Sequence, residues 1–309
     1  MLTLIEASKL SANAGDLYTA TIMELYAKNS EPLRVLPLKN IPGNTYKFNR
    51  EDELPDVDFR GVNEAWDEST GEVGTMVDTL AIGGGDLDVD KFITATEGMG
   101  TRAAQIQMKV KALSLYITKT IIKGDVASNK RSFNGLQVRM TGDQIIKNST
   151  AASGAGLSLK KLDELIDQVD EPTHLFMNKG MRRILTEAAR LYTVGGYITY
   201  TKDEFGRRVT QYNDLPIIIV DKDNKNMDIL PWTEAADSGS SVCASIYCIS
   251  TSANGVALLQ NGDMQVTDLG EIDAEPKYRT RVEWYVGLTV QRELSAARLK
   301  NIQNTTPVS

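Results

Sequence analysis

Residues 50–90 read REDELPDVDFRGVNEAWDESTGEVGTMVDTLAIGGGDLDVD and decide how the chain is organised. This stretch carries 13 acidic side chains and two basic ones, Arg50 and Arg60, which gives it a net charge of −11. The wider stretch 43–90 opens with strand-like Thr45–Asn49 and closes with strand-like Met76–Ile82, and between them are turn formers and few large apolar residues. The pattern predicts a long two-stranded excursion without a hydrophobic core of its own.

Such an excursion needs another surface to lie on. An isolated two-stranded ribbon is at best marginally stable in water, and crowded acids repel one another. The whole chain has 34 basic and 41 acidic residues, so the part outside residues 50–90 has 32 bases, 28 acids and a net charge of +4. We therefore expect the acidic segment to lie across a neighbouring copy.

The clearest regular element follows at Met99–Lys123. Its apolar residues recur at helical intervals and predict one long amphipathic helix, with a stripe made of Ile106, Val110, Leu113, Ile117 and Ile121. Its other faces carry basic residues, among them Arg102, Lys109, Lys111, Lys119 and Lys123. These basic side chains form either a solvated face or a landing surface for the acidic ribbon of another copy.

The remainder of the chain mixes helices and strands. Helices are expected from Ser158 to Val169 and from Lys179 to Leu191, and one short helix is expected at Leu17–Lys28 inside an extended arm. Strand patterns recur at Thr173–Asn178, Tyr197–Thr201, Leu215–Val220, Ser241–Ser250, Ala257–Gln260, Met264–Asp268 and Arg279–Arg292, before a short tail at Leu294–Ile302. This mixture predicts the α+β class.

Composition excludes several classes of protein. The chain has 309 residues and a formal charge of −7, which argues against a nucleic-acid-binding protein held by a basic face. No secretory signal is visible at the start, and no apolar run approaches the roughly 20 residues of a membrane span. Cys243 and Cys248 lie on opposite faces of one predicted strand, so a disulfide is not expected and a reducing cytoplasm fits.

Signals for chemistry are weak. The single histidine, His174, lies in a predicted buried strand, where a packing role is favoured over catalysis. Asp86, Asp88, Asp90 and Glu97 imitate a calcium loop, but Lys91 stands where that loop requires glycine. Gly83, Gly84 and Gly85 lack the setting of a dinucleotide fingerprint and are expected to ease a bend.

Paired acids are the remaining candidates for catalysis. Glu51 with Glu53, or Glu64 with Glu68, would suit acid/base work only in a pocket that raises a carboxyl pKa. Among so many acids they are better interpreted as solvated or intersubunit charge. We expect no enzyme activity, no catalytic residues, no metal and no cofactor.

Several short motifs resemble a known family. They are Gly43-Asn44, Arg50-Glu51, Leu54-Pro55, Phe59-Arg60, Asn63-Glu64, Gly83-Gly84-Gly85-Asp86-Leu87-Asp88-Val89-Asp90, Phe133-Asn134-Gly135-Leu136, Trp284-Tyr285-Val286-Gly287-Leu288 and Ala296-Ala297-Arg298-Leu299. Together with the order of elements, they resemble the major capsid proteins of tailed bacteriophages with the Hong Kong 97-like fold.

The resemblance implies a division of the chain into the parts of that fold. It implies an N-terminal arm at 1–42, an extended acidic β-hairpin loop at 43–90 and a peripheral domain with the spine helix at 91–150. An axial domain follows at 151–254, and residues 255–309 return to the peripheral domain and form a C-terminal tail.

The resemblance also implies the function. We expect a structural protein that assembles into pentamers and hexamers of an icosahedral phage head around double-stranded DNA, without sequence-specific contacts. Scaffolding, portal and decoration proteins are the implied partners, the virion is the implied location, and synthesis is expected in the host cytoplasm. No long charged helix precedes the arm, so a separate scaffolding protein is expected. The alternatives are an encapsulin-like cargo compartment and a carboxylate-dependent enzyme.

Contacts between copies should then involve both the ribbon and the helix. The expected contact residues are Arg50, Glu51, Glu53, Phe59, Arg60, Glu64, Trp66, Glu68, Lys109, Lys111 and Lys119.

Overall fold

The computed structural model describes Thr3 and residues 30–97, 99–151, 153–190, 198–202, 206, 208–237, 239, 241–273 and 275–307. The predicted helix at Leu17–Lys28, and nearly all of the predicted arm, lie outside the described residues. The first described helix is α3 (Glu31–Val35), which begins at the N-cap Ser30, whose hydroxyl accepts a hydrogen bond from the Leu33 amide at 3.3 Å.

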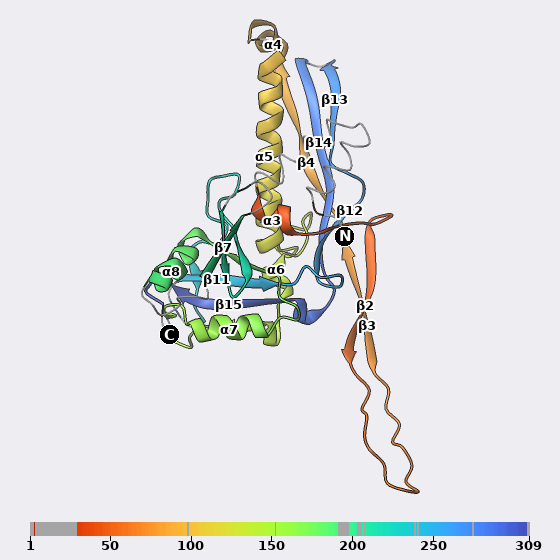
Figure 1. Ribbon diagram of the computed structural model, residues 1–309. Coiled ribbons are helices and arrows are strands. Elements are labelled where there is room, and N and C mark those ends of the chain that lie inside the picture. Colours follow the sequence, from red (N-terminus) through yellow and green to blue (C-terminus); the bar gives the residue numbers. More distant parts are fainter. Residues whose placement is uncertain are drawn as a thin grey trace.

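A five-stranded sheet forms the elongated half of the molecule (Figure 1). The long strand β14 (Glu275–Val290) pairs along one part of its length with β13 (Gln265–Ile272) and β4 (Ala81–Asp90), and further along with β12 (Val256–Gln260). The short strand β1 (Leu38–Asn40) lies parallel to β12 at the edge.

The helix α5 (Met99–Lys123) runs along this sheet, preceded by α4 (Lys91–Glu97) (Figure 1). The predicted helix boundaries are confirmed, and so is its stripe, because Val110, Ile117 and Ile121 are at most 2% exposed. The stripe packs with Trp284 and Val286 of β14 in one core. Burial of this stripe explains why so long a helix is stable.

An eight-stranded sheet forms the more compact half. Its strands follow the order β5 (Ile145–Lys147), β15 (Ala296–Gln303), β11 (Ser241–Ile249), β6 (His174–Met177), β9 (Leu215–Ile219), β8 (Arg208–Tyr212) and β7 (Ile198–Lys202), with β10 (Glu234–Ala235) beside β11. Helices α7 (Leu159–Asp167) and α8 (Lys179–Arg190) belong to this half, and both were predicted to within two residues.

The two faces of this sheet serve two cores. Leu175, Met177 and Ile217 pack with the buried residues of α7 and α8. Their strand neighbours Phe176 and Ile218 instead belong to the core that contains α5 and the first sheet. Alternation along each strand therefore joins the two halves into one body. Short helices complete the described part at α6 (Leu136–Arg139), η1 (Gly142–Gln144) and η2 (Glu293–Ser295).

A two-stranded ribbon leaves this body. Strands β2 (Thr45–Glu53) and β3 (Glu72–Thr79) pair antiparallel, and the intervening chain reaches far from both sheets (Figure 1). The predicted two-stranded excursion is present, but the expected extent of 43–90 is wrong at its end. Residues 81–90 form β4 in the first sheet, because Val89 is buried there, Leu87 is half-buried, and β14 pairs with the whole strand.

The glycines of β4 also differ from expectation. Gly83, Gly84 and Gly85 lie in a continuous strand and ease no bend. A β-carbon at Gly84 would lie 2.3 Å from the Val282 carbonyl oxygen, so only glycine allows β14 to approach this closely.

Two further domain boundaries are corrected by the sheet pairing. The residues Leu294–Ile302, expected to be a tail of the peripheral domain, contain β15, which lies between β5 and β11 in the second sheet. Strand β5 joins the same sheet although it falls in the expected peripheral range 91–150. Pairing between strands far apart in the sequence places β5 and β15 in the second sheet, and local sequence patterns do not predict such pairing.

In the described part of the chain, no helix combines the length and the apolar character that crossing a membrane requires.

Candidate assembly surfaces

The ribbon is the most exposed part of the described chain. Every described side chain from Leu54 to Val73 is exposed. Large apolar side chains lie among them, with exposed fractions of 92% for Val57, 99% for Phe59 and 92% for Val62. Trp66 is 62% exposed. A set of apolar side chains in this state is typical of a surface that a partner covers.

The base of the ribbon is firmly attached to the body. Arg50, an expected contact residue, donates hydrogen bonds to the Val290 carbonyl at 2.9 Å and the Gln291 carbonyl at 3.2 Å. On the other strand, Asp78 pairs with Arg139 of α6 at 2.7 Å, and the Asp78 side chain is only 8% exposed. These contacts fix where the ribbon leaves the sheet.

The tip of the ribbon, residues 59–66, is ordered by hydrogen bonds and a ring contact among its own residues. Arg60 donates to the Glu64 carbonyl at 3.1 Å, and the Glu64 carboxylate accepts the Gly61 amide at 2.7 Å. The Arg60 guanidinium also lies 5.5 Å from the centre of the Trp66 ring. The tip therefore presents Phe59 and Val62 from a locally ordered turn, which lowers the entropy cost of binding.

The remaining expected contact residues of the ribbon are the glutamates Glu51, Glu53 and Glu68. Glu68 is exposed beside the tip. Glu51 and Glu53 belong to β2, but their side chains lie outside the described residues. The sequence-based list missed Val57 and Val62, although both could have been found as apolar residues surrounded by acids and turn formers.

One of the three lysines of the expected basic landing surface on α5 has a partner within the chain itself. Lys119 pairs with Asp223 at 2.8 Å, and this contact holds the pKa of the nearly inaccessible Asp223 carboxyl below its ordinary value. Lys109 lies beside Gly85, near Asp86, whose pKa is lowered mainly by its hydrogen bond with Arg281 and only slightly by the Lys109 charge. Lys111 is exposed and forms no ion pair with a described residue. Of the three lysines, Lys109 and Lys111 form no ion pair with a described residue, so their charges are available to another copy.

The acids of β4 also have partners that the sequence did not reveal. Arg281 binds Asp86 through two hydrogen bonds of 2.7 and 3.1 Å, and Arg279 binds Asp88 through two of 2.7 Å. These contacts lower the pKa of both carboxyls. Asp86 and Asp88, the first two residues of the segment that resembles a calcium loop, therefore form ion pairs with the neighbouring strand.

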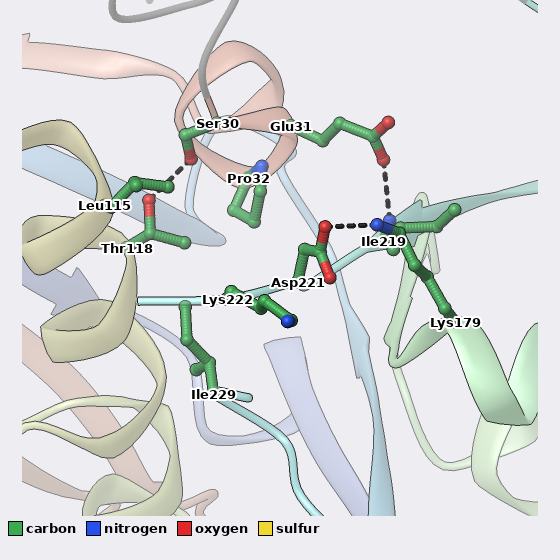
Figure 2. A pocket seen from close by; sticks show the side chains of 10 residues that line it. All are labelled: Ser30, Glu31, Pro32, Leu115, Thr118, Lys179, Ile219, Asp221, Lys222 and Ile229. Atoms are coloured by element: carbon green, nitrogen blue, oxygen red, sulfur yellow. Dashed lines mark hydrogen bonds and ion pairs between the residues drawn. The ribbon is translucent and has the colours of Figure 1, made fainter. Parts of the chain in front are cut away.

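A small cavity of about 190 Å³ lies where α3, α5 and the second sheet meet (Figure 2). Its polar groups are engaged with one another: the Glu31 carboxylate accepts the Ile219 amide at 2.8 Å, and the Ser30 and Thr118 hydroxyls lie 2.6 Å apart. Lys179 reaches Asp221 across its rim, as Figure 2 shows. The contacts of Ser30 and Glu31 connect α3 with α5 and with β9, and the cavity is better interpreted as a joint between the two halves than as a catalytic pocket.

The histidine is half-buried and the two cysteines are buried. Burial and the nearby Arg34 charge lower the pKa of His174 to about 4, so its imidazole is neutral at pH 7. Cys243 and Cys248 are both buried and not joined in a disulfide. Among the described residues, no group of three or more His, Cys, Asp or Glu side chains is placed to hold a metal ion.

Solved structures share this architecture. The holo-SrpI encapsulin complex from Synechococcus elongatus PCC 7942 matches with a TM-score of 0.64 and 16% identity, covering 90% of this chain and 89% of that one. The capsid of an empty GTA particle matches with a TM-score of 0.61 and 12% identity over 89% and 90%. A structure of Mycobacterium phage Adephagia matches with a TM-score of 0.58 and 13% identity over 92% and 91%.

The expected α+β Hong Kong 97-like capsid fold is therefore confirmed, and so is the resemblance at the level of fold. No model of a protein family matches the sequence, and no curated protein matches it.

Proposed function

We propose that this chain is the major capsid protein of a tailed bacteriophage, a structural subunit of an icosahedral head that encloses double-stranded DNA. One observation carries the proposal: the ribbon presents Phe59, Val57 and Val62 almost fully to solvent at a distance from the chain's own core. A partner surface must cover these side chains, and the shared fold makes a second copy the natural partner.

The geometry of such a contact determines what assembles. The ribbon and the surface that receives it are different parts of the chain, so the contact is head-to-tail. Head-to-tail contacts either close into rings or continue into a lattice. In a closed shell made of rings of five and six subunits, every ribbon would be covered by a neighbouring subunit.

Apolar burial would supply most of the binding free energy. Covering a side chain such as Phe59 contributes about 1.5–3 kcal/mol, whereas an exposed ion pair contributes about 0–1 kcal/mol. The acids of the ribbon would then select the partner surface more than they strengthen the contact. A large shell multiplies this modest contact over many copies.

The proposal includes partners and location. The implied partners are a separate scaffolding protein, a portal and decoration proteins, with DNA held without sequence-specific contacts. The chain would be made in the host cytoplasm and reside in the virion. Its role would be structural, without catalysis, metal or cofactor.

A second candidate function follows from one comparison. The encapsulin from Synechococcus elongatus matches with a TM-score of 0.64, so the same fold in this chain would also suit a cargo compartment. The contents of purified particles distinguish the two: DNA supports the phage head, and a co-purifying enzyme without nucleic acid overturns it in favour of the compartment.

The assembly proposal is tested by replacing the apolar tip. The double variant Phe59→Ser and Val62→Ser should prevent particle formation in sedimentation and negative-stain microscopy, while circular dichroism of the subunit stays unchanged. Met227→Ser is the matched control, because Met227 is 63% exposed but lies away from the ribbon, and it should assemble normally. Particles formed equally well by the double variant would contradict the proposal.

The absence of catalysis is tested separately at the paired acids. Glu51→Gln together with Glu53→Gln should leave the unassembled subunit folded, and any loss should appear in assembly. A turnover that these substitutions abolish while particles still form would overturn the structural role.

A further inference from the structure

A basic cleft lies in the second half of the molecule, away from the ribbon. It has a volume of about 600 Å³ and opens between helix α8 and the hairpin β7–β8. Arg182 and Arg183 line it from the helix, and Arg208 lines it from the hairpin. The sequence analysis did not anticipate this cluster, because residues 183 and 208 are brought together only by the fold.

The charges of this cleft are mostly uncompensated. Lys179, at its edge, pairs with Asp221 and is turned toward the neighbouring cavity (Figure 2). The guanidinium groups of Arg182, Arg183 and Arg208 form no ion pair with a described carboxylate. Three like charges held around one cleft repel one another, so their grouping is unfavourable until an anion binds.

One of the arginines is held in position. The Arg208 guanidinium lies 3.5 Å from the centre of the Tyr200 ring, over its face. Stacking of this kind restricts the side chain and leaves the donor edge of the guanidinium free to bind. The cleft is therefore partly ordered before any ligand arrives.

The lining selects among possible anions. Besides its cations, the described residues that line the cleft are Tyr200 and two threonines, Thr186 and Thr210, and none of them is aliphatic. The acidic ribbon of another copy fits poorly, because its tip also presents Phe59 and Val62, which need an apolar site. A phosphate group fits well, since the planar fork of arginine matches its oxygens and no apolar contact is required.

We propose that this cleft binds backbone phosphates of a nucleic acid strand. The inference rests on the proposed function, in which the shell surrounds DNA, and it adds a specific contact site on the subunit. Arginine contacts with phosphates carry no sequence information, so binding would be independent of sequence and strongly dependent on salt. Such a site allows an acidic chain to hold DNA locally although its overall charge is −7.

The test uses unassembled full-length protein and a fluorescein-labelled DNA duplex of mixed sequence. Arg183→Ala together with Arg208→Ala should weaken binding on the order of tenfold and reduce the slope of log affinity against log salt by about 2. The matched control is Lys130→Ala together with Arg131→Ala, which removes the same charge from exposed positions after α5. The control should change the affinity less than about twofold.

Three outcomes separate the possibilities. Equal losses in the two double variants would overturn the proposal, because binding would then depend on net charge alone. Binding of poly-glutamate in place of DNA, lost only in the Arg183 and Arg208 variant, would also overturn it and assign the cleft to an acidic protein segment. If Arg208→Ala disturbs folding, the single variant Arg183→Ala carries the test with half the change in salt slope.

Failure of this proposal differs from failure of the proposed function. Sedimentation of the parent protein reports assembly independently of DNA affinity. Particles without specific DNA binding would leave the shell function intact and exclude the cleft as a phosphate site.

Discussion

Two neighbouring acidic segments of this chain have opposite structures. The strand β4 (residues 81–90) lies in a five-stranded sheet, where Asp86 and Asp88 pair with arginines and Val89 is buried. The ribbon loop (residues 54–71) contacts neither sheet, and its apolar side chains stand in solvent. Two segments of similar composition therefore differ: the charges of β4 are paired within the chain, whereas the apolar side chains of the ribbon loop remain exposed.

The two segments differ because, among the described residues, only β4 has a partner strand within the chain. The arginines that complete β4 come from β14, nearly 200 positions later in the sequence, with separations of 191 and 195 residues. The ribbon loop receives no such segment in the described part of the chain. A second copy is the partner that would complete it in the same way.

The largest expected effect comes from crowding β4. Gly84→Ala should lower the free energy of unfolding by about 3 kcal/mol, because its new methyl group would collide with the Val282 carbonyl oxygen at 2.3 Å. Thermal unfolding of the unassembled protein measures this loss.

The ribbon supplies the matched control for that substitution. At Gly61 the nearest atom to a new β-carbon is the Glu64 carboxylate at 2.8 Å, which is the end of a flexible side chain. Gly61→Ala should change the free energy of unfolding by less than about 0.5 kcal/mol. Equal losses at the two glycines would mean that the ribbon loop is packed as tightly as β4.

An intermediate effect is expected where the ribbon meets the body. Arg139→Met should cost about 2 kcal/mol in unfolding free energy, because it leaves the nearly buried Asp78 carboxylate without its charged partner at 2.7 Å. Denaturant titration measures the change.

The same substitution at the ribbon tip should cost much less. Arg60→Met removes a guanidinium that bonds only within the exposed tip, so a change below about 0.5 kcal/mol is expected. A cost at Arg60 equal to that at Arg139 would show that the tip contacts the body.

The smallest expected effect is on the stability of the folded chain at low pH. The ion pairs hold the pKa of Asp86 and Asp88 below the ordinary value of 3.8, so the unfolded chain binds more protons than the folded chain as the pH falls below about 4. Their stabilisation is thus present above that pH and is lost as the pH drops through the lowered pKa values. Asp86→Asn with Asp88→Asn should flatten this part of the curve of melting temperature against pH.

Ribbon acids provide the comparison here as well. Asp56 and Asp58 form no ion pair with a described residue, so replacing both by Asn should leave the acid dependence of the unassembled protein unchanged. A flattening as large as that of the β4 variant would remove the distinction between the two segments.

Features that depend on neighbouring residues were predictable from the sequence. The helix Met99–Lys123 was predicted with its buried stripe, because the spacing of Val110, Ile117 and Ile121 is a local property. The two-stranded ribbon was predicted for the same reason, since an excess of acids with few apolar residues indicates a segment without a core.

The end of the ribbon was not predictable in this way. Residues 81–90 continue the acidic composition, and nothing within them shows that Arg279 and Arg281 lie opposite. The pairing of Lys119 on α5 was not predictable for a related reason, because its partner Asp223 lies 104 residues away.

The periodicity of nearby side chains is enough to show that Met99–Lys123 is helical and that residues 50–71 carry charge without a core. Contacts between distant residues settle which charges are paired within the chain. The tertiary structure placed β15 between β5 and β11, gave β4 its arginines, gathered Arg183 and Arg208 around one cleft, and left Phe59 in solvent. Strand pairing and ion pairing join residues far apart in sequence, so only the folded chain shows where a second copy is still needed.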